Sequence, residues 1–110
     1  MREIKFKAWD KKNKKMYQVG GLELALDGKI HGVRCFQREG LLTDFIIREY
    51  TKRKDRNGVE IYADDITDLG NVSWSDVDGA WVLPDSLLAG KIVKVIGNIY
   101  EDPDLNREEW

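Results

Sequence analysis

The chain has 110 residues, a length typical of one domain with a single modest core, so residues 1–110 are treated as one domain. Hydrophobic residues make up 42% and charged residues 35%, and no apolar run approaches the ~20 residues of a membrane span, which indicates a globular protein with no membrane partner. Cys35 is the only cysteine, so an intrachain disulfide is excluded and a cytoplasmic location is expected.

The net charge of −2 conceals a strong asymmetry along the chain. Residues 1–58 hold 15 Lys and Arg against 8 Asp and Glu, whereas residues 59–110 hold 3 against 12. Such polarity is typical of a surface for nucleic acid or for a head-to-tail partner. The alternative is that both halves interleave in one small β-domain, so that much of the polarity cancels in space. The candidate partners are therefore an unknown protein, a second copy of the chain in a homo-oligomer, or nucleic acid.

Strands dominate the expected elements, because apolar residues recur with a period of two more often than with a period of 3.6. The first two strands enclose the polar stretch DKKNKK, residues 10–15, which predicts an N-terminal hairpin. Residues 37–44 are compatible with either a short helix or a loop. The expected strands cover residues 3–9, 15–19, 22–26, 29–36, 45–51, 59–63, 68–76, 79–84 and 91–100.

Turn signals separate several of these strands. Residue pairs that favour tight hairpin turns occur at Asp27-Gly28, Asn57-Gly58 and Asp78-Gly79. Trp74 and Trp81 flank the last pair and are expected to face each other across that hairpin.

A short helical turn is expected at Asp102-Pro103, because aspartate can cap a helix and proline suits the first helical position. Many short strands with frequent turns are typical of an all-β barrel or sandwich. The pattern therefore predicts a mainly β fold with an N-terminal hairpin and a short C-terminal helical turn.

The acidic segment KDRNGVEIYADDI, residues 54–66, is the first candidate for a chemical site. In a calcium-binding EF-hand loop with Gly58 at position 6, position 1 falls on Arg53, a cation where a carboxylate is needed. Asp64 and Asp65 point to opposite faces if they lie in a strand, so they would not converge on one metal or one reacting bond. In a loop they could converge. We interpret these residues as turn carboxylates.

His31 and Cys35 are too few ligands for a zinc site. Four residues of extended strand also place them about 13 Å apart, too far for a nucleophile and its base. No phosphate-binding glycine loop or nucleophile elbow is found in the sequence. We therefore assign no catalytic residue, cofactor or metal, and expect that the protein is not an enzyme.

A candidate nucleic-acid-binding surface lies at the N-terminus, where basic residues alternate with aromatic ones. Such a surface can follow a phosphate backbone and stack bases. The alternative is a solvated face whose lysines protect an edge strand from aggregation. The candidate residues are Lys5, Lys7, Trp9, Lys11, Lys12, Lys14 and Lys15.

Three blocks of the sequence, in this order, resemble the YopX family of phage and prophage proteins. They are MREIKFKAWDKKNKKM (1–16), KDRNGVEIYADDI (54–66) and VIGNIYEDPDL (95–105), and a V-x-W strand at residues 72–74 also matches. The resemblance implies a small SH3-like β-barrel, no established enzymatic activity and the cytoplasm of a bacterial host. It favours a non-catalytic binding or interaction module, with nucleic-acid binding through the basic N-terminal face as the alternative.

Two positions depart from the family pattern. The family has Thr-Gly where this chain has Thr51-Lys52, and Gly-Asp-Ile where this chain has Asp64-Asp65-Ile66. If position 64 requires a positive φ, aspartate there costs up to roughly 1–2 kcal/mol relative to glycine.

Overall fold

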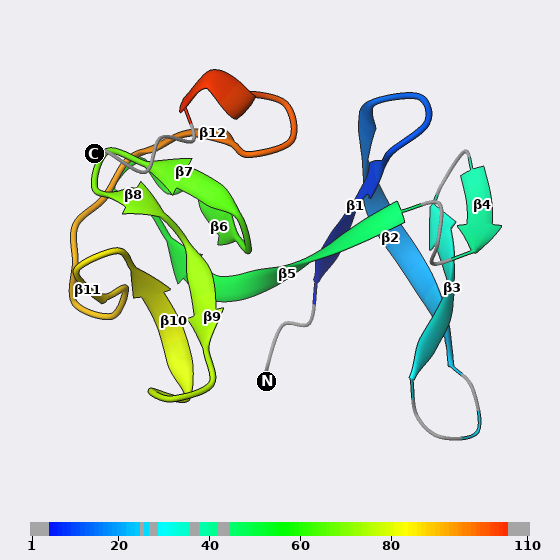
Figure 1. Cartoon of the computed structure of the whole chain (residues 1–110), viewed down its shortest axis with the longest axis horizontal. Coiled ribbons are helices and arrows are strands. Elements are labelled where there is room, and N and C mark those ends of the chain that lie inside the picture. The colour runs from blue at the N-terminus through cyan, green and yellow to red at the C-terminus, as the bar shows by residue number, and fades with distance from the viewer. Residues whose placement is uncertain (1–4, 25, 27–28, 36–37, 42–44, 106–110) are drawn as a thin grey trace. The chain divides into compact units, whose positions relative to one another are not determined.

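The computed structural model describes residues 5–24, 26, 29–35, 38–41 and 45–105 (Figure 1). Within these residues the structure is β apart from one 3-10 turn, which confirms the prediction of a mainly β fold. The chain divides into two compact units, Met1–Glu49 and Tyr50–Trp110, and each is described by itself. No helix in the described part is long and apolar enough to cross a membrane.

The first unit is an antiparallel sheet. Its strands are β1 (Phe6–Asp10), β2 (Lys15–Leu24), β3 (Ile30–Cys35), β4 (Arg38–Leu41) and the first half of β5 (Phe45–Lys54). β1 and β2 form the predicted N-terminal hairpin, in which Asp10 lies opposite Lys15, and β1 also pairs with β5. The small core contains Ala8 and Phe45, and the ring of Tyr17 meets that of Phe45 edge to face at 6.5 Å.

The second unit begins within β5, where Tyr50 and Lys54 pair with residues of β6. Its further elements are β6 (Glu60–Tyr62), β7 (Asp65–Thr67), β8 (Gly70–Asn71), β9 (Ser73–Ser75), β10 (Ala80–Leu83), β11 (Ser86–Leu87), β12 (Val95–Asn98) and the 3-10 turn η2 (Pro103–Leu105). Two three-stranded sheets form in the orders β11-β10-β9 and β12-β7-β8. The buried core cluster consists of Ile61, Val72, Leu83, Leu88 and Val93.

Two local predictions in the second unit are confirmed. Trp74 and Trp81 are cross-strand partners in β9 and β10, and their ring centroids lie 5.3 Å apart at an interplanar angle of 73°. The helical turn is η2, in which the Leu105 N–H donates to the Asp102 carbonyl at 3.0 Å.

The strand predicted over residues 91–100 is wrong at its start, because β12 begins only at Val95. The N–H of Lys91 donates to the Leu88 carbonyl at 3.1 Å, and the N–H of Lys94 donates to the Asp68 carboxylate at 3.0 Å. The first of these amides closes a local turn and the second bonds to a side chain distant in sequence, so neither takes part in a strand ladder.

The described strands form three separate sheets, and no closed barrel is found among them, so strand pairing does not confirm the SH3-like barrel. Within residues 37–44, for which a short helix or a loop was expected, Arg38–Leu41 form strand β4. The predicted Asp27-Gly28 turn lies outside the described residues.

Candidate functional site

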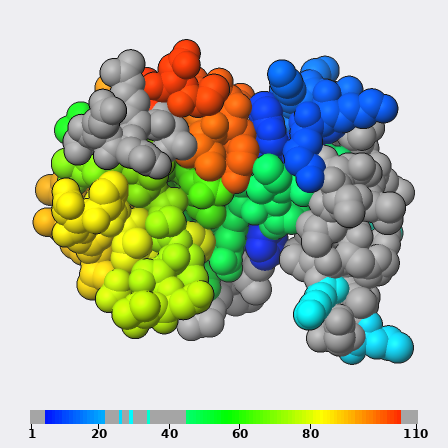
Figure 2. Space-filling model, viewed as in Figure 1, coloured from blue at the N-terminus to red at the C-terminus, as the bar shows by residue number. Residues whose placement is uncertain are grey.

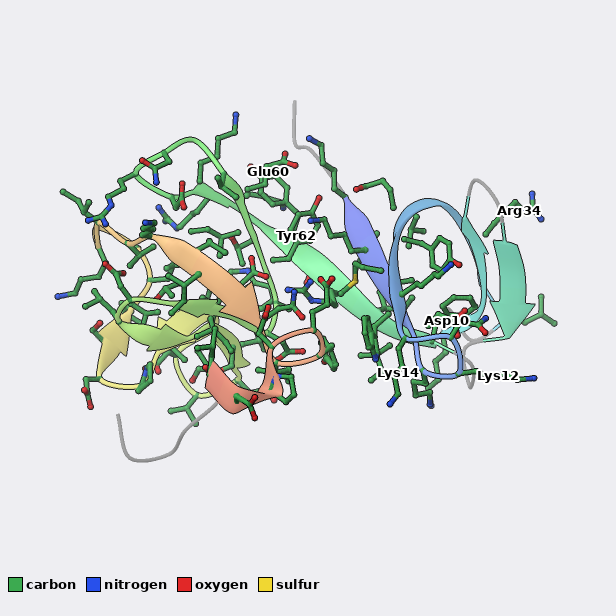
Figure 3. The ribbon with its side chains drawn as sticks, turned by 90° about the horizontal axis from the view of Figure 1, so that it is seen from above. Asp10, Lys12, Lys14, Arg34, Glu60 and Tyr62 are labelled. Carbon is green, nitrogen blue, oxygen red and sulfur yellow. The ribbon has the colours of Figure 1, made fainter. Side chains whose placement is uncertain are left out.

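The lysine-rich turn between β1 and β2 is held from inside by Asp10, a fully buried residue. Its Oδ1 accepts hydrogen bonds from the N–H groups of Lys12 at 3.0 Å and Asn13 at 3.1 Å, and its Oδ2 accepts one from the Asn13 side-chain amide at 2.9 Å. The N–H of Lys14 donates to the Asp10 carbonyl at 2.8 Å, with φ at +54° for Lys14. Asp10 thus fixes the backbone from which the lysines extend (Figure 3).

The predicted nucleic-acid-binding residues fall into two groups. The side chains of the turn are exposed, and the turn projects from the surface (blue in Figure 2). The residues in and just before β1 are half-buried and take part in interactions within the protein. The exposed group is Lys11, Lys12, Lys14 and Lys15, and the half-buried group is Lys5, Lys7 and Trp9. The accessible charge of this candidate surface is therefore concentrated in the turn.

Asp55, in the central acidic segment, is buried and bonded to backbone amides. Its Oδ1 accepts from the N–H groups of Asn57 at 2.8 Å and Val59 at 2.9 Å, and its Oδ2 accepts from that of Val95 at 2.9 Å. Burial acts to raise the pKa of the Asp55 carboxyl, but these three amide donors and the nearby Arg56 charge outweigh it and hold the pKa below its usual value. The carboxylate therefore joins the turn of residues 57–59 to the start of β12.

Asp64 and Asp65 are bonded to different partners. The Asp65 Oδ2 accepts from the Tyr62 N–H at 2.8 Å, which closes the short connection between β6 and β7. The Asp64 Oδ2 accepts from the Tyr100 hydroxyl at 2.5 Å. Asp64 has φ at +68°, which is the positive φ at which aspartate is less favourable than glycine. The aspartate side chain gains a hydrogen bond that a glycine could not make.

We expect the Asp64–Tyr100 bond to contribute about 1 kcal/mol to the free energy of unfolding. Tyr100→Phe should therefore destabilise the natural chain more than it destabilises the Asp64→Gly variant, with a coupling of about that size in a double-mutant cycle measured by urea denaturation. Equal effects of Tyr100→Phe in the two backgrounds would show that this hydrogen bond is energetically neutral.

The segment after β12 is a turn closed by its own side chains. The Asn98 Oδ1 accepts from the N–H groups of Tyr100 at 3.0 Å and Glu101 at 2.9 Å, and the Asp102 Oδ2 accepts from the Asn98 N–H at 3.2 Å. A Cβ added at Gly97 would lie 2.6 Å from that Asp102 oxygen, so this position has no space for a side chain. The last matched sequence block thus contains a turn held by its own side chains and is also bonded to Asp55 and Asp64.

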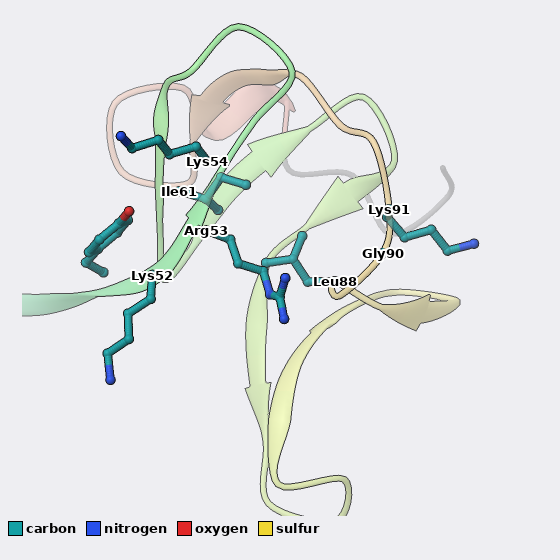
Figure 4. Close-up of a pocket in the computed structure, with 8 residues that line it drawn as sticks. Lys52, Arg53, Lys54, Ile61, Leu88, Gly90 and Lys91 are labelled. Atoms are coloured by element: carbon teal, nitrogen blue, oxygen red, sulfur yellow. The ribbon is translucent and has the colours of Figure 1, made fainter. Parts of the chain in front are cut away.

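A pocket of about 400 Å³ lies in the second unit (Figure 4). Among the described residues that line it, half are cations and none is acidic. Sequence reasoning missed this site, although three consecutive cations at the end of β5 were a visible signal. The lining residues are Tyr50, Lys52, Arg53, Lys54, Ile61, Leu88, Gly90 and Lys91.

The chain is a small, mainly β protein. The hydrogen bonds described above show that residues of its matched sequence blocks form turns. The chain belongs to the YopX family, because the family described as "YopX protein" matches residues 5–106. The fold is similar to that in the crystal structure of protein EF1440 from Enterococcus faecalis, with a TM-score of 0.76 and 20% identity over 97% of this chain and 100% of that chain. None of the curated proteins matches this chain.

Proposed function

We propose that this YopX-family chain is a phage- or prophage-derived, non-catalytic binding module of the bacterial cytoplasm. The buried carboxylates of its central motif accept hydrogen bonds from backbone amides, Asp55 from three of them and Asp65 from that of Tyr62, which supports a structural role for these acids. We further propose that the small sheets of the second unit are arranged around their core as an SH3-like barrel.

The ligand class that we propose is nucleic acid, bound by the lysine turn. The carrying observation is that the buried Asp10 carboxylate fixes a turn that carries three exposed lysines, with a fourth, Lys15, at the start of β2. Fixing the turn lowers the entropy cost of bringing several ammonium groups to one phosphate backbone. Each phosphate contact also releases counterions, so binding should weaken steeply with salt.

The test measures the fluorescence anisotropy of labelled single- and double-stranded oligonucleotides with 5′-hydroxyl ends as the protein is added. The titration is repeated at several salt concentrations. We expect the quadruple alanine variant at Lys11, Lys12, Lys14 and Lys15 to bind more weakly. For single strands, its slope of log affinity against log salt should be shallower by about 0.7 for each phosphate that the variant no longer neutralises.

The matched control removes the same number of charges outside both the lysine turn and the basic pocket, by alanine at the exposed residues Lys29, Arg34, Arg56 and Lys94. Equal weakening by both variants would indicate a net-charge effect without a site. An absence of binding at the lowest salt would reject nucleic acid as the ligand and leave a protein partner or a second copy of the chain as the candidates.

A further inference from the structure

We infer that the basic pocket of the second unit binds a terminal phosphate or diphosphate group, the chemistry shared by a nucleoside diphosphate and by the phosphorylated end of a nucleic-acid strand. This site is separate from the lysine turn and does not rest on it. Three observations carry the inference: the path of β5, the charges around the pocket, and the size of the pocket.

The path of β5 is irregular at the pocket. Tyr50 lies opposite Tyr62 and Lys54 opposite Glu60, so four steps along β5 correspond to two steps along β6. Two extra residues are therefore accommodated in β5, and Lys52 within them has φ at +68°. Such bulges redirect side chains and are frequent beside functional sites.

The bulge brings three consecutive residues of β5 to one pocket. In a regular strand, Arg53 would point away from the face that Lys52 and Lys54 share. Here all three residues line the same pocket. The Thr51 hydroxyl holds this arrangement, because it donates to the Ile61 carbonyl at 2.7 Å and accepts from the Arg53 N–H at 3.2 Å.

A second segment supplies the fourth cation. Gly90, with φ at +79°, and a hydrogen bond from the Lys91 N–H to the Leu88 carbonyl place Lys91 at the pocket. In Figure 4, Lys54 and Lys91 extend outward in opposite directions, whereas Arg53 extends toward the Leu88 side.

Nearby acidic side chains lower the attraction that a cation of the pocket exerts on an anion. The ion pair between Arg56 and Asp68, at 4.0 Å, involves none of the lining residues. Glu60 lies opposite Lys54 in the register and reduces the positive potential at that lysine. We therefore expect Lys54 to contribute less than the other cations, and Arg53, which extends toward Leu88, to contribute most to the attraction for an anion.

The size of the pocket sets the class of ligand. A volume of about 400 Å³ lies within the range of roughly 300–1,000 Å³ of small-molecule sites and exceeds the need of a single phosphate. The Arg53 guanidinium can hold two oxygens of one phosphate, while lysine acts as a point charge. Tyr50, Ile61 and Leu88 are nearly fully buried and give the pocket an apolar floor. A diphosphate with an attached organic group fits this combination.

The test is isothermal titration calorimetry of the full chain at low salt with pyrophosphate, ADP and adenosine. We expect saturable binding of pyrophosphate and ADP that weakens with salt, and none of adenosine. Arg53→Gln should weaken ADP binding about tenfold or more, because a charge-assisted hydrogen bond contributes about 1.5–3 kcal/mol. The matched control, Lys94→Gln, changes an exposed lysine outside the pocket lining and should alter the affinity less than about twofold.

Two further arms complete the design. A 5′-phosphorylated oligonucleotide that binds more tightly than its 5′-hydroxyl counterpart, with the difference removed by Arg53→Gln, would identify a strand end as the source of the phosphate. Otherwise the free nucleotide is the source. The quadruple lysine-turn variant should retain ADP binding, so failure of the lysine-turn hypothesis and failure of this one are distinguishable. The inference is overturned if neither pyrophosphate nor ADP binds at low salt, or if Lys94→Gln weakens binding as much as Arg53→Gln.

Discussion

Replacement of Asp55 by alanine is expected to lower the free energy of unfolding by at least about 3 kcal/mol, the largest effect that we predict for this chain. The substitution removes the acceptor of three backbone N–H groups, those of Asn57, Val59 and Val95, at a site where the replaced side chain is buried. A hydrogen bond to a charged group contributes about 1.5–3 kcal/mol, and three such bonds are lost together.

Urea denaturation followed by tryptophan fluorescence measures this effect. Asp55→Asn keeps one side-chain oxygen as an acceptor and should be intermediate. Asp85→Ala is the matched control, because Asp85 is exposed and surface substitutions usually change stability by less than about 0.5 kcal/mol. If Asp55→Ala is no more destabilising than Asp85→Ala, the structural role of Asp55 is refuted.

The pH dependence gives a second readout of the same carboxylate. Because the pKa of Asp55 is lowered in the folded state, the unfolded chain binds the proton more readily. The contribution of Asp55 to stability is then fully present above its unfolded pKa of about 3.9 and is lost as the pH falls through the folded pKa. We expect the difference in unfolding free energy between the natural chain and Asp55→Asn to shrink as the pH is lowered below about 4.

Gly70→Ala is expected to lower the free energy of unfolding by about 2–5 kcal/mol. Gly70 has φ at +111°, and a Cβ added there would lie 2.5 Å from Cγ and 2.7 Å from Cδ of Pro84. A proline ring is closed onto its own backbone and cannot move aside as the end of a flexible side chain can. The backbone cost of about 1–2 kcal/mol and the overpacking cost of about 1–3 kcal/mol therefore both apply.

Gly79→Ala separates these two costs. Gly79 also has a positive φ, at +61°, but a Cβ added there would meet no atom within 4 Å. This variant should show only the backbone cost, about 1–2 kcal/mol. Equal destabilisation at the two positions, again by urea denaturation, would show that the clash with Pro84 relaxes without cost.

Local features of this fold were predictable where the residues that determine them lie close together in the sequence. The N-terminal hairpin, the Trp74–Trp81 pair and the turn at Asp102-Pro103 each depend on adjacent strands or on capping. The role of Asp55 was not predictable, because one of its donors, Val95, is 40 residues away.

The candidate sites divide in the same way. The exposed lysine turn follows from DKKNKK, but the burial of Asp10 beneath it does not, because an aspartate next to a polar loop is normally solvated. The basic pocket escaped prediction because strand alternation assigns Lys52 and Arg53 to opposite faces, and only a bulge brings them together.

The two departures from the family pattern now have a common description. Lys52 and Asp64 both stand where the pattern has glycine, and both have φ at +68°. Both residues thus adopt the left-handed backbone conformation that glycine favours, although each carries a side chain. Asp64 uses its side chain to accept from Tyr100, and Lys52 adds a charge to the pocket.

The hydrogen bond from Val95 to Asp55 also bears on how the protein is made. During synthesis at about 5–20 residues per second, Asp55 precedes Val95 by about 2–8 s, since 40 residues separate them. Throughout that interval the carboxylate has only its two local donors, Asn57 and Val59. The nascent second unit therefore remains incomplete until β12 emerges from the ribosome.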